Sequence, residues 1–333
     1  MEQPPARIEA VSPDPIVTIA TGYMAAAQLF AASRIGLFPA LVAGPATAAE
    51  LADACGTPPR TTRILADTMA SVGLLSRDGG DYDLTPPARA YLTQDSAELD
   101  LAPFLAFLEA ISFPHWDAFG RTVDTDAAAP LDLAGPRWDT FLAGVMRYND
   151  LHARMLVDRI DLSRYRTVLD LGGLAATFTI AEHAAAPHLR TTMVFDPASA
   201  DAVRAQIGSA GLADAVVVEA AETTSARPAG PFDLVQLVHV IHRYDAVRNT
   251  EIFRHAREAC HPGATLLVLD FFLDDLPQQR ALDAWHAGEY LVIDGTVVHP
   301  LADVRSWLAE SGWRAVDLVD LPGSPRVLVA EAV

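Results

Sequence analysis

The sequence predicts an α/β fold in its second half, preceded by a small helical domain that carries a β-wing. From residue 166 onward, five short apolar runs alternate with helical or alanine-rich segments: RTVLDL, TTMVFD, AVVVEA, FDLVQLVHVI and ATLLVLDFF. Near-continuous apolar strands of this kind are typical of a parallel sheet covered on both faces. In the first half, helical patterns are followed by LLSRDGGDYDLT, which indicates two short strands joined by an Asp-Gly-Gly turn.

The first half begins with an unusually apolar helical pattern. Residues 15–33 carry apolar side chains all around the helix, so we expect this segment to be buried, in part against another chain. Thr47 and Glu50 have the spacing of a capping box, and Pro59 marks the start of a further helix. With the β-wing, these elements have the order of a winged helix.

Composition and charge exclude several classes of function. The 333 residues include 43 acidic and 24 basic side chains, which gives a net charge of −19. Such a surface repels phosphate backbones and anionic lipid, so we expect neither a nucleic-acid nor a membrane partner. The predicted recognition stretch carries only Arg60 and Arg63, which favours dimerisation over DNA binding. The apolar segment 15–43 is interrupted by polar residues, and the first ten residues lack signal-peptide features, so we expect a cytoplasmic protein.

Three regions follow from these patterns. We expect a winged-helix-like dimerisation domain at 1–98, linker helices at 99–160 that contribute to a substrate pocket and to the dimer, and a Rossmann-like domain at 161–333. In the last region LADVRSWLAESGW predicts an amphipathic helix. AVDLVDL and RVLVAEAV predict an antiparallel pair of strands that closes the sheet.

Acidic residues and a histidine stand at successive strand ends of the predicted sheet. Ligands of such sheets bind beyond the carboxyl ends of the strands. Asp170 and Asp196 end the first two strands, and a carboxylate at the second position can accept ribose hydroxyls. Glu222 follows the third strand. His242 ends the fourth strand, where it can take a proton from a hydroxyl with the help of Asp270.

The order of these motifs resembles the S-adenosylmethionine-dependent O-methyltransferases of small-molecule metabolism, the group with the phenolic, hydroxyindole and polyketide enzymes. The motifs are VLDLGG, VFD, GLADAVVVEAAE, LVHVIHRYD, HPGATLLVLDFFLDD and WLAESGW, and with the N-terminal region they span nearly the whole chain. The resemblance implies a class I methyltransferase fold, an intertwined homodimer and His242 as general base, oriented by Asp270. Asp196 would hold the ribose and Glu222 would lie by the adenine. The full cofactor-binding set expected for S-adenosylmethionine is Asp170, Gly172, Gly173, Asp196, Glu222 and Val238.

Three departures from the family pattern bear on the function. Leu174 and Ala176 occupy loop positions where the family has glycines, and Arg243-Tyr244 replaces the usual Asp-Trp. A second acid expected before the last helix is missing from residues 295–300. A Cβ at Leu174 would fill space used by the methionine part of the cofactor, and a left-handed backbone there costs ~1–2 kcal/mol. Either the loop is displaced or the site has lost the cofactor, and we expect glycine at both positions to improve binding.

Four functions remain open on the sequence. The first is methyl transfer to a small aromatic or enolic hydroxyl compound. The second is a repurposed fold that catalyses cyclisation, isomerisation or hydroxylation, in which Arg243 stabilises an enolate or a carboxylate. The third is a metal-assisted C-methylation of a 2-oxo acid with His242 and His299 as ligands, although we expect no metal. The fourth is a non-catalytic dimer. The acceptor pocket is expected at Phe113, His115, Trp116, Met146, Asn149, Trp285, Tyr290 and His299.

Overall fold

The computed structural model describes residues 11–94, 99–173, 175–274 and 277–333. The chain divides into two compact units, residues 1–109 and 110–333. The expected linker region 99–160 is therefore shared, because its first eleven residues belong to the first unit and the rest to the second.

The first unit consists of helices around a three-stranded antiparallel sheet of order β1-β3-β2. The capping box at Thr47 and Glu50, the helix start at Pro59 and the two wing strands are all present. The core of this unit includes Leu37, Phe38 and Tyr82. Its elements are α1 (Asp14–Arg34), η1 (Pro39–Leu41), β1 (Ala46–Thr47), α2 (Ala48–Cys55), α3 (Pro59–Ser71), β2 (Leu75–Asp78), β3 (Asp81–Leu84), α4 (Pro86–Tyr91) and α5 (Ala102–Phe107).

Helix α1 is buried within its own chain only near its C-terminal end, and burial against another chain, which we also expected, stays a prediction. Phe30 and Ala32 are its buried residues, and Gln28 accepts a hydrogen bond from Thr68 of α3, so the C-terminal part of α1 is docked. The N-terminal part is exposed, with Ile16 at 72% and Ile19 at 69%. By length and composition alone α1 is long and apolar enough to cross a membrane, a test that the core helix of a soluble protein or a signal sequence also passes.

The second unit contains a seven-stranded sheet of order β6-β5-β4-β7-β8-β10-β9. Strands β4 to β8 run parallel, and β9 and β10 form the predicted antiparallel pair at one edge. The strands are β4 (Thr167–Leu171), β5 (Arg190–Phe195), β6 (Val216–Ala220), β7 (Phe232–Val238), β8 (Cys260–Asp270), β9 (Trp313–Asp320) and β10 (Arg326–Ala332). The prediction of a mostly parallel sheet with an antiparallel closing pair is confirmed.

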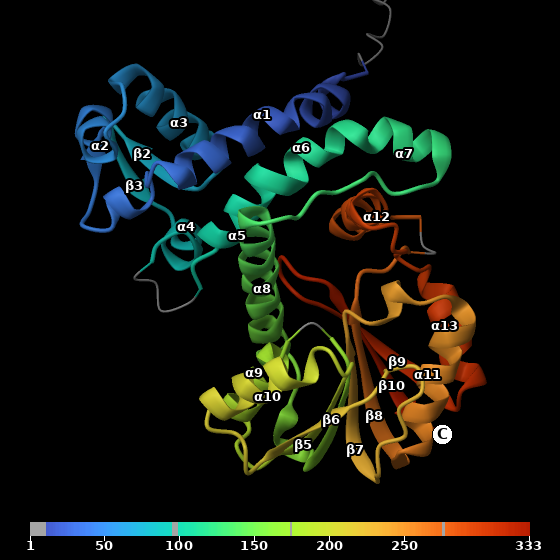
Figure 1. The fold of residues 1–333 in the computed structure, drawn as a ribbon. Helices are drawn as coiled ribbons and strands as arrows, with labels where there is room; N and C mark the ends of the chain where they lie inside the picture. Colours follow the sequence, from blue (N-terminus) through green and yellow to red (C-terminus); the bar gives the residue numbers. More distant parts are fainter. Residues whose placement is uncertain (1–10, 95–98, 174, 275–276) are drawn as a thin grey trace, which may run out of the picture. The chain divides into compact units, whose positions relative to one another are not determined.

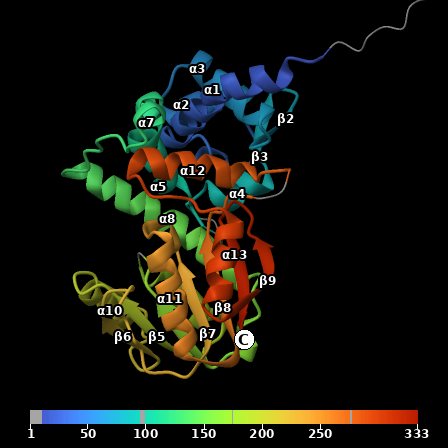
Figure 2. The same ribbon diagram turned by 90° about the vertical axis from the view of Figure 1, so that its right-hand side faces the viewer.

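Helices cover both faces of this sheet (Figures 1 and 2). Helices α11 and α13 pack on one face through residues such as Phe253 and Leu308, and α8 and α9 pack on the other through Leu156 and Phe178. Helix α10 packs on β5 and β6. The helical elements are α6 (Phe113–His115), α7 (Phe119–Thr125), α8 (Pro136–Val157), α9 (Thr177–Ala185), α10 (Ala200–Ser209), α11 (Ala246–Glu258), α12 (Ala281–Ile293) and α13 (Leu301–Glu310), with short turns η2 (Leu108–Ser112), η3 (Trp116–Ala118), η4 (Leu162–Arg164) and η5 (Ile241–Arg243).

Candidate active site

Two glycines open the loop after β4. Gly172 and Gly173 have φ values of +94° and +122°, which side-chain-bearing residues rarely adopt. A Cβ on Gly172 would lie 2.9 Å from Thr223 Oγ1, and one on Gly173 would lie 3.4 Å from the carbonyl oxygen of Val238. Both positions thus need glycine for the backbone conformation, and Gly172 also needs it for its close approach to Thr223. They line a cavity of about 10 Å³, room for about one water molecule, together with Asp170, Asn149 and His239.

Leu174 and Ala176 stand at the two loop positions where the family pattern has glycines. Leu174 lies outside the described residues, so the steric conflict expected there stays a prediction. Ala176 has φ −74° and ψ 1°, an ordinary conformation for any residue. Its side chain is fully buried in the cluster with Met193 and Phe195. Ala176 is therefore a core residue, and the expectation that glycine at this position would help a ligand is not supported by its conformation.

Carboxylates stand at the same edge of the sheet. Asp196 follows β5 and accepts hydrogen bonds from the backbone amides of Ala198 and Ser199 at 3.0 and 3.1 Å. Hydrogen bonds from Ser199 and Ala198 hold the pKa of Asp196 below its usual value, so it is an anion at neutral pH. Glu222 follows β6 and is exposed. Because β4, β5 and β6 are parallel neighbours, both acids lie at the edge where the glycines lie.

Beneath the glycines lies a buried pair of carboxyl groups. Asp170 accepts a hydrogen bond from Thr179 Oγ1 at 3.1 Å, and Glu182 accepts one from Gln236 Nε2 at 3.3 Å. Burial raises the pKa of Asp170 to about 7. Burial, together with repulsion from Asp170, raises the pKa of Glu182 well above its usual value. Burial therefore favours the neutral form of both carboxyl groups.

His242 and Asp270 form a hydrogen-bonded dyad. Asp270 is the last residue of β8, whereas His242 lies in the η5 turn after β7 and does not end the strand as we expected. His242 Nδ1 lies 2.9 Å from Asp270 Oδ2 and 3.2 Å from Oδ1. Asp270 is fully buried, which favours protonation, but the charge and the hydrogen bond of His242 outweigh burial and hold the pKa of Asp270 below its usual value. An ionised Asp270 accepts the Nδ1 proton of a neutral imidazole. This arrangement leaves Nε2 as the basic nitrogen.

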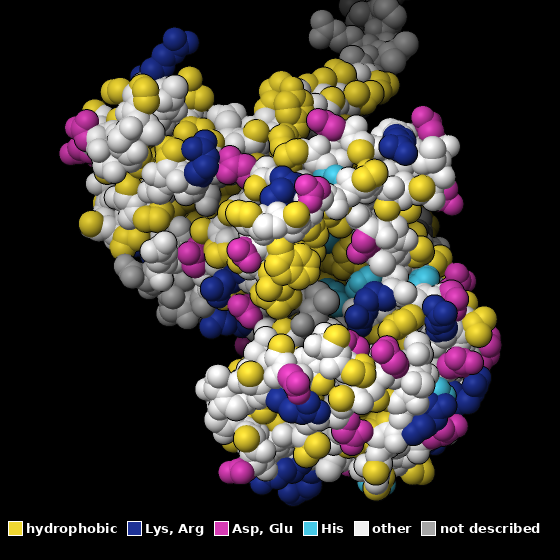
Figure 3. Space-filling model, viewed as in Figure 1, with side chains coloured by type: hydrophobic (Ala, Val, Ile, Leu, Met, Phe, Trp, Pro, Cys, Tyr) yellow, Lys and Arg dark blue, Asp and Glu magenta, His cyan; other side chains and the backbone are white. Residues whose placement is uncertain are grey.

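Further histidines surround this dyad. His239 Nε2 lies 3.0 Å from His152 Nδ1, and the His239 ring centroid lies 6.3 Å from that of His242. His286 stacks on Phe271 with centroids 3.8 Å apart. Burial lowers the pKa of His239 and of His286 to about 4, and that of His152 well below its usual value. These three rings are neutral at physiological pH. Figure 3 shows histidine side chains in the hollow beside the sheet domain.

His239, His242 and Asp270 also have the spacing of a metal site. One ligand atom from each lies within 4.8 Å of the others. His242 and Asp270 are close because they share a hydrogen bond, which needs no metal ion. His299, the expected second metal ligand, lies elsewhere: its Nε2 is 3.1 Å from the carbonyl oxygen of Ile241 and 3.0 Å from that of Tyr244. His299 thus supports the η5 turn, and it is not part of the described cluster.

Helix α12 supplies aromatic contacts to the dyad. The Tyr290 ring centroid lies 4.6 Å from that of His242. Trp116 donates a hydrogen bond to Glu289 Oε2 at 2.6 Å, and a Cβ on Gly288 would lie 2.8 Å from its ring. His115 Nε2 lies 3.0 Å from the carbonyl oxygen of Val292. Trp116 and His115 therefore hold α12 in place, while Tyr290 faces the dyad.

The remaining predicted pocket residues have different surroundings. Asn149 is buried beside the glycine loop and lines the small cavity, which places it nearer the cofactor side than we expected. Met146 is partly buried on α8. Phe113 and Trp285 are 39% and 58% exposed, so the structure does not bury them in a pocket.

Sequence reasoning missed His239 as a site residue and took it for a core histidine. It is buried, but it has φ +53°, lines the cavity and lies beside His242. The available signal was its position three residues before His242 at the end of a strand. His152 and His286 carry no such signal, because α8 and α12 bring them to the sheet only through tertiary packing.

Comparisons with known proteins agree along most of the chain. A family model of the O-methyltransferase dimerisation domain matches residues 17–94, and a model of the O-methyltransferase domain matches residues 116–314.

Relatives and solved structures are similar over long stretches. The chain is 29% identical over 326 residues to 3-hydroxy-5-methyl-1-naphthoate 3-O-methyltransferase of Streptomyces sahachiroi, covering 95% of this chain and 94% of that protein. It is 32% identical over 260 residues to aclacinomycin 10-hydroxylase RdmB of Streptomyces purpurascens, covering 72% and 67%. The crystal structure of the S-adenosylmethionine-dependent methyltransferase SibL in its apo form is similar with a TM-score of 0.86 at 26% identity, covering 96% and 99%.

Proposed function

This chain belongs to the O-methyltransferase family, and we propose that it transfers a methyl group from S-adenosylmethionine to a hydroxyl of a small aromatic or enolic compound in natural-product biosynthesis. The observation that carries this proposal is the His242–Asp270 dyad at the carboxyl edge of the sheet, with Nε2 left as a base beside Tyr290. A relative that methylates a hydroxynaphthoate supports an aromatic acceptor.

The residues at the sheet edge suit the cofactor. Gly172 and Gly173 provide the bare backbone that a ligand can approach, and Asp196 is an anion able to accept hydrogen bonds from ribose hydroxyls. Glu222 and Val238 follow at the ends of the next strands. When bound, the cofactor supplies an activated methyl group on a sulfonium.

His242 prepares the acceptor. Asp270 fixes the imidazole orientation and its tautomer, so Nε2 can take the proton of a hydroxyl placed in hydrogen-bond reach. Tyr290 packs against the ring from α12 and limits its movement. The neutral rings of His239, His152 and His286 place no positive charge beside the dyad, so they do not oppose protonation of His242 during turnover. The remaining rate acceleration would come from holding the acceptor hydroxyl in line with the methyl group of the cofactor.

A direct assay tests this proposal. The protein is incubated with S-adenosylmethionine and hydroxyarenes, and mass spectrometry follows S-adenosylhomocysteine and a product that has gained one methyl group. His242→Ala should lower turnover by ~10²–10⁴-fold while S-adenosylhomocysteine binding is retained. His242→Gln keeps a hydrogen-bonding side chain without a usable base, so it should be equally slow. His261→Ala, an exposed histidine on β8, serves as the matched control. Native turnover in the His242→Ala variant would remove His242 from the mechanism.

A second candidate is non-methylating chemistry on the same fold, such as hydroxylation. Two observations favour this candidate: one relative is named as a 10-hydroxylase, and Leu174 stands at a loop position where the family pattern has glycine. S-adenosylmethionine with a deuterated methyl group separates the two functions. Methyl transfer predicts a product that carries the label, and the alternative predicts an unlabelled product with no S-adenosylhomocysteine formed.

A further inference from the structure

Arg243 is an unpaired cation in a strongly acidic protein. Within the part of the chain that the structure describes, its guanidinium forms no ion pair and no hydrogen bond, although the chain carries 43 acidic residues. Its recorded contact is with the Tyr244 ring, whose centroid lies 5.9 Å from Cζ. The side chain is exposed. A guanidinium forms five hydrogen bonds when it is fully used, so Arg243 has its donors available.

The backbone that carries Arg243 is fixed. The Arg243 amide donates to the carbonyl oxygen of Val240 at 3.1 Å. On either side of the residue, Asn249 Nδ2 donates to the carbonyl oxygens of Ile241 and Tyr244, both at 2.9 Å. His299 contacts the same two carbonyl groups. The backbone around Arg243 is therefore fixed by buried polar contacts, which limits the region that the guanidinium can reach.

That region is the edge of the glycine loop. A Cβ placed on Gly172 would lie 3.6 Å from Arg243 Nη2. The positive charge also acts on Asp196, where it adds to the hydrogen bonds that keep the pKa of that carboxyl low. Arg243 directly follows His242 of the dyad in the sequence, and its guanidinium lies beside the loop where a cofactor would bind.

We propose that Arg243 is an anion-binding residue that holds a carboxylate of a bound ligand. A planar guanidinium pairs with a carboxylate through two parallel hydrogen bonds, and Arg243 has no protein carboxylate to occupy it. The carboxylate comes either from the amino-acid part of the cofactor or from the acceptor, as in an aromatic hydroxy acid. This inference rests on the proposed function for the identity of both ligands.

Binding measurements with two ligand pairs test the proposal and separate the two sources. The first pair is S-adenosylhomocysteine and 5′-methylthioadenosine, which lacks the amino-acid part. The second pair is 3-hydroxy-2-naphthoate and 2-naphthol. Calorimetry compares native protein with Arg243→Gln, with Arg243→Lys, which keeps the charge but loses the fork, and with Arg248→Gln, an exposed arginine on α11 that serves as the control.

The expected result is a selective loss. Arg243→Gln should weaken the carboxylate member of one pair by about ten- to hundredfold and leave its carboxylate-free partner unchanged. Arg243→Lys should give an intermediate loss, and Arg248→Gln none. Loss for S-adenosylhomocysteine identifies the cofactor as the source, and loss for hydroxynaphthoate identifies the acceptor. No selective loss in either pair overturns the proposal. Because binding is read without turnover, this failure is distinct from a failure of methyl transfer.

Discussion

At the scale of single residues, Asp170 and Glu182 are two buried carboxyl groups whose pKa values are both raised by burial. Asp170 Oδ1, Glu182 Oε1 and Gln236 Oε1 are buried without a hydrogen-bond partner among the described residues. A proton on either carboxyl group provides the missing donor. These two buried carboxyl groups therefore keep their protons to a higher pH than solvated carboxyl groups do.

Asp170 makes the stability of the protein depend on pH. Its pKa is raised from 3.8 to about 7, so the folded protein binds this proton more tightly than the unfolded chain does. The resulting stability is fully present below the unfolded pKa and is lost as the pH rises from about 4 through 7. Asp170→Asn removes this loss. At pH 8 the variant should exceed the native protein by about 4 kcal/mol in free energy of unfolding, and the gap should narrow toward pH 4.

Urea unfolding of the ligand-free protein across this pH range checks the prediction. Asp214→Asn, at an exposed position, should follow the native profile and serves as the control. A gap between Asp170→Asn and native that stays constant with pH would show that Asp170 does not titrate in this interval.

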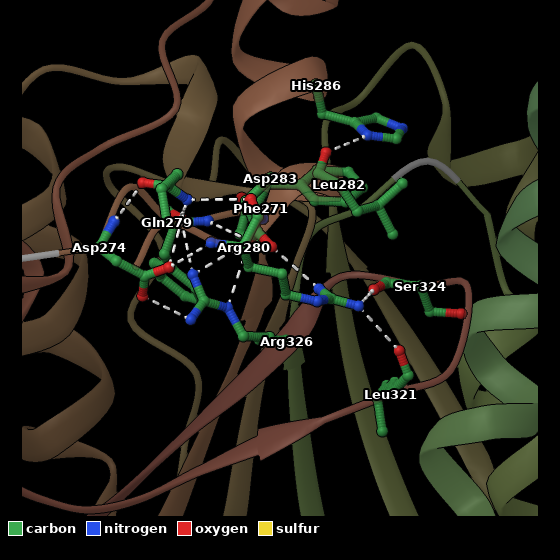
Figure 4. Close-up of polar contacts among 12 residues, drawn as sticks. Phe271, Asp274, Gln279, Arg280, Leu282, Asp283, His286, Leu321, Ser324 and Arg326 are labelled. Atoms are coloured by element: carbon green, nitrogen blue, oxygen red, sulfur yellow. Dashed lines mark hydrogen bonds and ion pairs between the residues drawn. The ribbon is translucent and has the colours of Figure 1, made fainter. Parts of the chain in front are cut away.

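At the scale of elements, α12 is tied to the sheet by a buried ion-pair network at its N-terminus (Figure 4). Arg326 at the start of β10 donates to Asp274 Oδ1 at 2.6 Å, to the carbonyl oxygen of Phe272 at 2.7 Å and to Asp283 Oδ1 at 3.3 Å. Asp283, which is fully buried, also accepts from Arg280 at 3.0 Å. The network joins the end of β8, the start of β10 and the first turn of α12, and α12 carries Tyr290 to the dyad.

Removing Arg326 should therefore be costly. Arg326→Gln leaves Asp283 buried with one of its two cationic partners gone, and breaking such a pair costs about 3–5 kcal/mol. Arg314→Gln breaks an exposed pair with Glu331 and should cost less than about 1 kcal/mol. Chemical denaturation of both variants gives the comparison. Equal losses for the two would mean that the buried network contributes no more than a surface pair.

Helices and strands could be predicted from the sequence where a local hydrophobic pattern determines them. Contacts within the candidate site could be predicted only for residues at the ends of strands. Apolar runs located the strands, and parallel pairing then placed Asp170, Asp196, Asp270 and His242 at one edge. The aromatic pocket was less predictable, because helix contacts depend on packing between distant segments. Trp285 faces solvent although Tyr290, five residues later on the same helix, contacts the dyad. Gly288, which admits the Trp116 ring, gave no sequence signal of this role.

At the scale of the whole molecule, α1 presents an apolar surface that the described residues of its own unit leave exposed. Ile16, Val17, Ile19, Tyr23 and Met24 are between 48% and 72% exposed. Figure 3 shows apolar side chains along this helix. Exposed apolar patches mark interaction sites, and the match of residues 17–94 to a dimerisation domain indicates a second copy as the partner. The charge of −19 argues against an anionic lipid surface as the alternative.

We therefore expect a homodimer that depends on the N-terminal half of α1. Replacing Ile16 and Ile19 together by Asp places two charges in the apolar surface, where buried anchors typically contribute 2 kcal/mol or more each. The double variant should be monomeric at micromolar concentration in light scattering, whereas the native protein should have twice the mass of the chain. Thr18→Asp places a charge about half a turn from Ile16 on the same helix and should remain dimeric. A native protein that is monomeric, or a dimer that tolerates both charges, would show that another surface or none holds two copies together. If the double variant dissociates yet keeps the affinity of native protein for S-adenosylhomocysteine, the cofactor site is complete within one chain.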